Sequence, residues 1–148
     1  MSALEMEFDE TFDTVIAINT LHHVVGSSVA VTYANLDEIM RRSHACLAPD
    51  GRLVIIESTM PRWFVAIYRR CFGLLLRVWP LEHPPTFQFY FREIISAAIR
   101  AGFELREVGF VPKTSDFIFL GRRVKRWMAP IQVAKFVFGL PEGDRRSR

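Results

Sequence analysis

The stretch that decides the fold is FDTVIAINTLHHV, residues 12–24. Its first part, FDTVIAI, is short and partly β-branched, and after Asp13 and Thr14 its last four residues, VIAI, are all apolar. Side chains of a strand point alternately to the two faces of a sheet, so a strand that is apolar at consecutive positions indicates a sheet covered on both faces. Such strands are typical of parallel sheets in α/β proteins, and the polar residues that follow mark the carboxyl end of this one.

A helix and a second buried strand follow. Asn35 can cap a helix, and Glu38 stands three residues later, as in a variant capping box. We expect this helix to end at residues 49–51, Pro-Asp-Gly, which have turn chemistry. Residues 53–56, LVII, are again apolar throughout. Strand, helix and strand at this spacing predict a right-handed βαβ unit.

The rest of the chain alternates between helical and strand patterns. Residues 62–80 and about 90–101 read as helices, the second ended by Gly102 in the position after the cap. An amphipathic piece, Trp127 to Phe138, precedes a polar tail. We expect four strands, near 12–18, 52–57, 103–110 and 116–121.

Composition excludes several classes of protein. The chain has 148 residues, of which 50% are hydrophobic and 24% charged, so it is globular and of one-domain length. The net charge of +3 is too diffuse for a nucleic-acid site, despite a basic cluster at 122–126. Cys46 and Cys71 have no metal-ligand spacing, and we expect no metal and a cytoplasmic location with reduced thiols.

Three segments, in order, carry a resemblance to a known family: EFDETFDTVIAINTLHHV (7–24), NLDEIMRRSHACLAPDGRLVIIES (35–58) and REIISAAIRAGFELREV (92–108). Together they resemble the C-terminal half of a class I S-adenosylmethionine-dependent methyltransferase of the small-molecule branch. That branch has an F-D-x-V strand with an L-x-H turn, then L-x-P-G-G, L-x-I-x-E and A-G-F. Asp50 stands where the family usually has glycine, which is a mild departure because Asp tolerates such turns.

The resemblance implies an α/β, Rossmann-like methyltransferase sheet. Its first three strands would be parallel, and the strand at 116–121 would be antiparallel and inserted between the second and third. Residues 1–121 would form a partial methyltransferase domain, followed by an amphipathic extension and polar tail at 122–148.

The nucleotide-binding half of the family pattern is missing. No G-x-G-x-G occurs in the sequence, and the acidic ribose ligand of the family has no counterpart. The strand at 12–18 would therefore lack one neighbour and leave an unpaired apolar edge. We expect either a fragment of a longer reading frame or a chain completed by a partner.

The resemblance also implies site residues for the cofactor S-adenosylmethionine. An Asp-Ala pair of the family meets the adenine, and here Ser2 stands in place of that Asp. The turn after the first strand would face the methionine part of the cofactor, since open α/β sheets bind ligands at the carboxyl ends of their strands. The implied cofactor-binding residues are Ser2, Ala3, Leu4, Asn19, Thr20 and Leu21.

His22 and His23 are the implied catalytic residues, near the transferred methyl group and the substrate. Histidine can act as a general base near neutral pH. The alternative is that one of them bonds a backbone carbonyl and shapes the loop. Glu57, at the end of the second strand, either lines the pocket or orients a loop.

The leading hypothesis is methyl transfer to a small, apolar or lipid-like molecule. The alternative is a non-catalytic binding or partner subunit, and membrane-surface association is a third reading. Arg62, Arg69, Arg70 and Arg77 fall within about a 100° arc of an otherwise apolar helix. The segment Arg62–Trp79 would lie at the inner face of a membrane with anionic lipid, cap an apolar pocket, or be a core helix with one basic stripe.

Overall fold

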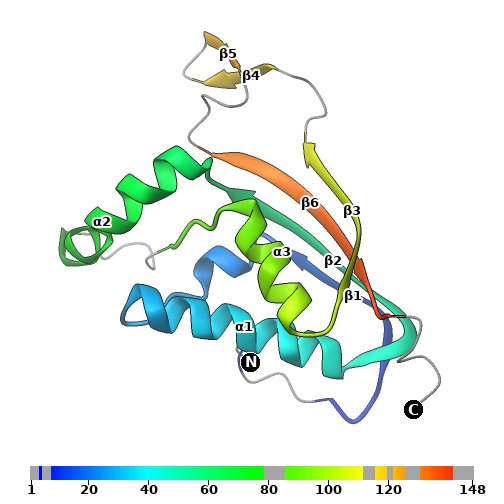
Figure 1. The fold of residues 1–148 in the computed structure, drawn as a ribbon. Helices are drawn as coiled ribbons and strands as arrows, with labels where there is room; N and C mark the ends of the chain where they lie inside the picture. The colour runs from blue at the N-terminus through cyan, green and yellow to red at the C-terminus, as the bar shows by residue number, and fades with distance from the viewer. Residues whose placement is uncertain are drawn as a thin grey trace.

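The computed structural model describes residues 4, 8–78, 86–111, 116–119, 122–125 and 131–141. A four-stranded sheet is packed on one face against two helices (Figure 1). A third helix and a small two-stranded hairpin extend from the ends of the strands (Figure 1). None of the helices within the described residues has the length and apolarity that crossing a bilayer requires.

The sheet has the strand order β1-β2-β6-β3. β1 (Phe12–Ile18) pairs in parallel with β2 (Leu47–Thr59). β6 (Gln132–Gly139) pairs antiparallel with both β2 and β3 (Glu104–Val111). The strands β1, β2 and β3 therefore run in the same direction, which confirms the predicted mixed sheet with one antiparallel strand between the second and third.

The identity of the inserted strand differs from the prediction, which is wrong on this point. The described part of the segment 116–121 does not take that position, since β4 (Asp116–Phe119) pairs instead with β5 (Arg122–Lys125) as a separate two-stranded hairpin. β6 takes the place, and it lies in the segment predicted as an amphipathic extension. Its alternation explains this, because Ala134, Phe136 and Phe138 are buried while Val133, Lys135 and Val137 are only partly covered.

The first long helix, α1 (Val29–Ala45), begins six residues before the predicted start at Asn35. Ser28 is its cap: the Ser28 Oγ accepts a hydrogen bond from the Val31 N–H at 3.2 Å. Thr32 strengthens this start, since its hydroxyl donates to the Ser28 carbonyl at 2.9 Å and accepts from the Gly26 N–H at 3.0 Å. The first turn contains β-branched residues, which have low helix propensity, so the sequence did not predict a helix start there.

The Pro-Asp-Gly sequence at 49–51 lies inside β2 and does not form the predicted turn between elements. The pairing register shows how the strand accommodates it: Phe12 is opposite Leu47, but Thr14 is opposite Arg52. The extra residues of β2 form a bulge at this irregularity. Gly51 suits the crowding there, because a Cβ would lie 2.9 Å from the Phe12 carbonyl oxygen.

The two remaining helices lie at the predicted places. α2 is Arg62–Val78, and α3 is Phe91–Arg100 with Ala101 as its cap residue. Gly102 follows with φ of 97°, which confirms it as the helix-ending residue. One prediction for α2 is wrong: Arg69 leaves the solvated basic stripe, since its guanidinium binds Glu93 of α3 and the Tyr33 hydroxyl of α1.

The two faces of the sheet differ sharply. On one face α1 and α3 cover a core that includes Leu53, Ile55, Phe136 and Phe138 (Figure 1). The alternate residues of the same strands form the other face, which carries no helix within the described part of the chain. Its most exposed apolar side chains are on β1, where Ile16 is 62% and Ile18 57% exposed.

Candidate functional site

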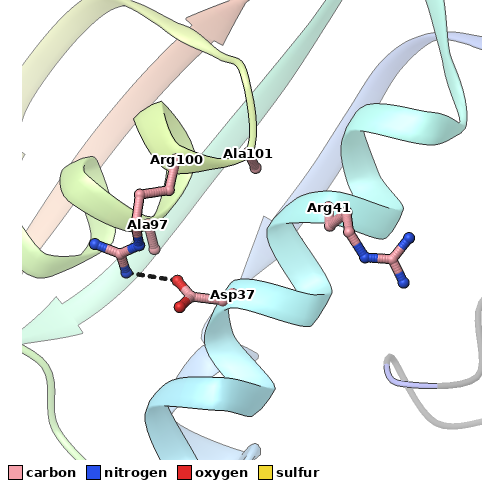
Figure 2. A pocket seen from close by; sticks show the side chains of 5 residues that line it. All are labelled: Asp37, Arg41, Ala97, Arg100 and Ala101. Carbon is pink, nitrogen blue, oxygen red and sulfur yellow. Dashed lines mark hydrogen bonds and ion pairs between the residues drawn. The ribbon is translucent and has the colours of Figure 1, made fainter.

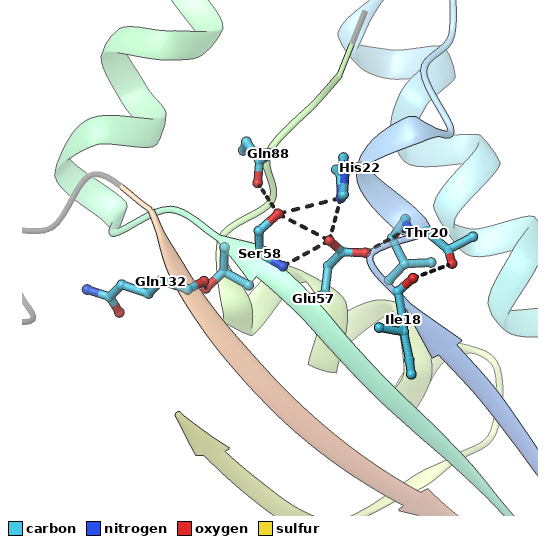
Figure 3. A network of polar contacts seen from close by, with 9 residues as sticks. Ile18, Thr20, His22, Glu57, Ser58, Gln88 and Gln132 are labelled. Carbon is cyan, nitrogen blue, oxygen red and sulfur yellow. Dashed lines mark hydrogen bonds and ion pairs between the residues drawn. The ribbon is translucent and has the colours of Figure 1, made fainter. Parts of the chain in front are cut away.

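A cluster of polar groups lies where the carboxyl ends of β1 and β2 meet (Figure 3). The chain leaves β1 through Asn19, whose φ of 49° lies in the left-handed region that Asn tolerates better than most residues. The Asn19 N–H still donates to the Ile56 carbonyl at 2.8 Å. This turn directs the following 3-10 turn η2 (Leu21–His23) across the end of β2.

Glu57 is the centre of this cluster. Its side chain is completely buried, and its carboxylate accepts hydrogen bonds from several directions. The Leu21 N–H donates to Oε2 at 2.7 Å, while the Ser58 N–H donates to Oε1 at 2.9 Å. These contacts hold η2 against the end of β2. They agree with the predicted alternative that Glu57 orients a loop.

His22 lies directly against this carboxylate, with Nδ1 2.6 Å from Glu57 Oε1. An ionised carboxylate only accepts hydrogen bonds, so Nδ1 carries the hydrogen and a neutral ring leaves Nε2 as the acceptor. The Phe87 N–H fixes the backbone by donating to the His22 carbonyl at 2.8 Å. The side chain of His22 is 14% exposed, and this carboxylate–imidazole pair can therefore orient a base that accepts a proton at Nε2.

Ser58 and Gln88 extend the network from Glu57 and His22 Nδ1 (Figure 3). The Ser58 hydroxyl lies 2.9 Å from Gln88 Oε1, 3.2 Å from Glu57 Oε1 and 3.5 Å from His22 Nδ1. Its single hydrogen can serve only one of the two acceptors, Gln88 Oε1 or Glu57 Oε1, at a time. Sequence reasoning missed Gln88, whose only signal is a polar residue within the apolar run FQFY.

The fold is similar, at low sequence identity, to those of solved structures that include SAM-dependent methyltransferases. A SAM-dependent methyltransferase from Methanosarcina mazei superposes with a TM-score of 0.60 at 14% identity, over 95% of this chain and 65% of that one. The cyclopropane synthase MmaA2 from Mycobacterium tuberculosis gives 0.59 at 14% identity, over 89% of this chain and 56% of the other. A LepI variant in complex with SAH and a substrate analogue gives 0.57 at 14% identity, over 95% and 29%.

This chain has the class I S-adenosylmethionine-dependent methyltransferase fold. No protein-family model matches the sequence, and no curated protein matches it either. The chain spans less than two thirds of the length of each of these three methyltransferase-fold structures.

The residues predicted to bind S-adenosylmethionine lie in different surroundings. Ser2 and Ala3 lie outside the described residues, and Leu4 packs against the core. Thr20 is near the end of β1 and donates its hydroxyl to the Ile18 carbonyl at 3.0 Å. Leu21 has its side chain in the core and only its backbone at the site.

The two predicted catalytic histidines are adjacent but differ in their contacts. Their ring centroids lie 4.1 Å apart at an interplanar angle of 42°. His23 is exposed, and its backbone N–H donates to the Thr20 carbonyl at 3.1 Å. Only His22 of the two bonds the buried carboxylate, so the geometry distinguishes two residues that the sequence could not rank firmly.

A separate shallow hollow lies between α1 and α3 (Figure 2). Asp37 and Arg41 of α1 and Ala97, Arg100 and Ala101 around the end of α3 line its volume of about 180 Å³. The Arg100 guanidinium and the Asp37 carboxylate bridge it at 2.5 Å. None of the predicted site residues lines this hollow, which belongs to the contact between the two helices.

Proposed function

We propose that this chain supplies the acceptor side of an S-adenosylmethionine-dependent methyl transfer to a small, apolar or lipid-like molecule. The observation that carries the proposal is the His22–Glu57 pair at the carboxyl ends of β1 and β2. Ligands of open α/β sheets bind at those ends, so the pair lies where an acceptor would meet a bound methyl donor.

The chemistry requires little from the protein beyond alignment and a proton acceptor. S-adenosylmethionine, when bound, supplies the electrophilic methyl group. The protein would hold an acceptor hydroxyl or amine in line with that group, which is catalysis by proximity and orientation. His22 Nε2 would take the proton of the acceptor, while Glu57 keeps the ring in the required tautomer and stabilises the imidazolium.

The residues present fit only part of the cofactor. The turn at Asn19 and Thr20 would meet its methionine portion through the backbone and one hydroxyl. The 148 residues contain no G-x-G-x-G to approach the nucleotide closely. We therefore propose that a further segment or a partner chain holds the nucleotide, and that the chain alone binds S-adenosylmethionine weakly or not at all.

The test is methyl transfer by the complete assembly, which is this chain together with the segment or subunit that holds the nucleotide. Labelled S-adenosylmethionine and a panel of small hydroxyl and amine acceptors report turnover. We expect His22→Ala to lower kcat about 100-fold or more, with little change in cofactor affinity, because general base catalysis contributes about that much. His23→Ala is the matched control and should be milder.

Two outcomes would contradict the proposed role. A His22→Ala variant that lost only cofactor binding would place His22 on the donor side. Full activity of that variant would remove His22 from the chemistry. Turnover of labelled S-adenosylmethionine by the completed assembly distinguishes methyl transfer from the alternative, a non-catalytic partner subunit, which would transfer no methyl group to any acceptor.

A further inference from the structure

Helix α2 has an inward face that fixes how it sits on the molecule. Val65 is buried at 3% exposure, and the Tyr68 hydroxyl donates to the Thr86 carbonyl at 2.7 Å. Arg69 binds the Glu93 carboxylate and the Tyr33 hydroxyl, and its guanidinium carbon lies 5.2 Å from the centre of the Tyr33 ring. These contacts determine which side chains of α2 point outward.

The outward face presents a stripe of large apolar side chains. Trp63 is 51% exposed, Ile67 58% and Leu74 64%. At 100° per residue these three fall within about 40° of one another, and Leu74 lies about 180° around the helix from the buried Val65. We call this the outer stripe. It points away from the core, so it does not cap an apolar pocket within the described part of the chain.

Within α2 the charge beside the outer stripe is positive only. Arg62 and Arg70 are exposed on one flank of it, and the whole helix contains four arginines and no acidic residue. Among the described residues, neither Arg62 nor Arg70 joins an ion pair, in contrast to Arg69. Their charge is therefore available to an anionic surface outside the molecule.

We propose that the outer stripe with Arg62 and Arg70 is a docking surface for a bilayer containing anionic lipid. Trp, Ile and Leu beside a band of arginines are the groups that enter the interface between head groups and acyl chains. Anionic head groups pair with the arginines. A second copy of this chain fits less well, because a two-fold contact through the stripe would bring the same unneutralised arginines together.

The experiment is flotation of the full chain with vesicles of phosphatidylcholine, alone or mixed with phosphatidylglycerol. Flotation is used because aggregated protein stays at the bottom of the gradient. We expect binding to the anionic vesicles about tenfold or more tighter than to the neutral ones, since each arginine near the surface contributes about a factor of five. S-adenosylmethionine is absent, so the result is independent of the proposed methyl transfer.

Two pairs of variants test the surface. R62Q/R70Q should lower the partition coefficient for anionic vesicles about tenfold or more. R92Q/R100Q, on α3, removes the same charge elsewhere and should change it about twofold or less. I67S/L74S should weaken binding to both kinds of vesicle, whereas Ile99→Ser, at an equally exposed site on α3, should not.

Three results would overturn the proposal. The native chain could fail to float with either vesicle. It could float equally well with both kinds of vesicle, and R62Q/R70Q and R92Q/R100Q could then have the same partition coefficient. Finally, I67S/L74S could abolish self-association in vesicle-free sedimentation velocity while nothing floats, which would make the stripe an interface between copies. Circular dichroism of each variant confirms that it is folded.

Discussion

The two faces of the one sheet are built from alternate residues of the same strands, yet they have opposite surroundings. On the covered face Ile55 and Phe136 are opposite each other in the pairing register and are almost completely buried. On the open face the neighbouring pair, Ile16 and Val54, is just as apolar, but Ile16 is 62% exposed. Both faces are apolar, so each needs a layer of helices to cover it. The described residues form one such layer.

The open apolar face is consistent with our proposal that a further segment or a partner chain completes this sheet. Monomeric soluble proteins rarely expose a contiguous apolar patch as large as a sheet face. The open side of β1 adds unpaired backbone groups, because β1 pairs only with β2 within the described chain. Variants on the two faces test this difference, beginning with the largest expected change in the free energy of unfolding.

The largest effect is expected for Phe136→Ala on the covered face. The ring is fully buried between β2 and the helices, so its loss removes apolar contacts and leaves a cavity. We expect the free energy of unfolding to fall by about 3–5 kcal/mol. Urea denaturation followed by far-UV circular dichroism measures it.

The matched control is the next residue of the same strand, Val137→Ala, on the open face. We expect a loss of about 1 kcal/mol or less. Equal losses for Phe136→Ala and Val137→Ala would contradict the comparison, because they would mean that the open face is buried in solution as deeply as the covered one.

An intermediate effect is expected for Glu57→Gln at the end of the covered face. The amide keeps one acceptor oxygen but turns an NH₂ toward the donors that Glu57 now accepts from. Buried donors left without an acceptor lower the free energy of unfolding by about 1–3 kcal/mol. Nitrogen NMR of the histidine rings should also show His22 losing its single tautomer.

Glu107→Gln is the control for that change. Glu107 is exposed on β3 and pairs with Lys135 at 3.1 Å, so its neutralisation should change the free energy of unfolding by about 1 kcal/mol or less. If the two variants were equally stable, the carboxylate of Glu57 would not be the acceptor that the structure places there.

A smaller effect on stability is expected for I16K/I18K on the open face. Both side chains are already exposed, so the free energy of unfolding of the monomer should change by about 0.5 kcal/mol or less. Self-association should change strongly, because charged side chains on an exposed strand oppose pairing between copies. Light scattering and sedimentation velocity should show the native chain associating and the variant not.

The outcome for the native chain tests the open face itself. A stable native monomer with micromolar affinity for S-adenosylmethionine would contradict both the need for a second layer and the proposed external nucleotide site. Adding the strands and helices of a nucleotide-binding half, fused or as a separate chain, should restore monomer-like behaviour and cofactor binding together.

A further small effect is expected for Tyr33→Phe, in the helix layer. Burial, and then the negative charge of Glu93, raise the pKa of Tyr33 well above its usual range. A raised pKa stabilises the fold fully below the ordinary tyrosine pKa of about 10, and this contribution is lost as the pH rises further. At neutral pH the free energy of unfolding of the native chain should exceed that of the variant by about 1 kcal/mol or less.

Urea denaturation from pH 8 to 11 measures this difference between native and Tyr33→Phe chains. We expect the difference to shrink as the pH rises above about 10. A difference that stayed constant over that range would mean that the Tyr33 hydroxyl is solvated and does not hold the layer of helices together.

Local patterns predicted the elements that depend on local chemistry. The strand at 12–18 and the end of α3 at Gly102 follow from continuous apolarity and from the left-handed backbone that glycine allows. The start of α1 was missed because Ser28 and Thr32 act through bonds to the backbone, which outweigh the low helix propensity of the residues around them.

Pairings between distant residues could not be predicted in the same way. The sequence predicted a strand at 116–121 and an amphipathic piece at Trp127–Phe138, and nothing local decides which of the two segments pairs with β2. The family resemblance predicted that His22 and Glu57 lie at the same end of the sheet. Their direct contact, and the exclusion of His23 from it, depend on the backbone turn at Asn19.

The position of β6 has a consequence for the order of events in folding. β6 lies between β2 and β3, but it is the last of the four sheet strands in the chain, and Thr59 contacts Gln132 across 73 residues. During synthesis β2 and β3 are made before β6, so each keeps an unpaired side until β6 leaves the ribosome. Closing such long loops slows folding and prolongs the time in which the strands can pair with other chains. We expect a slow refolding phase that reports the insertion of β6, and an affinity for chaperones that is greatest just before residues 132–139 emerge.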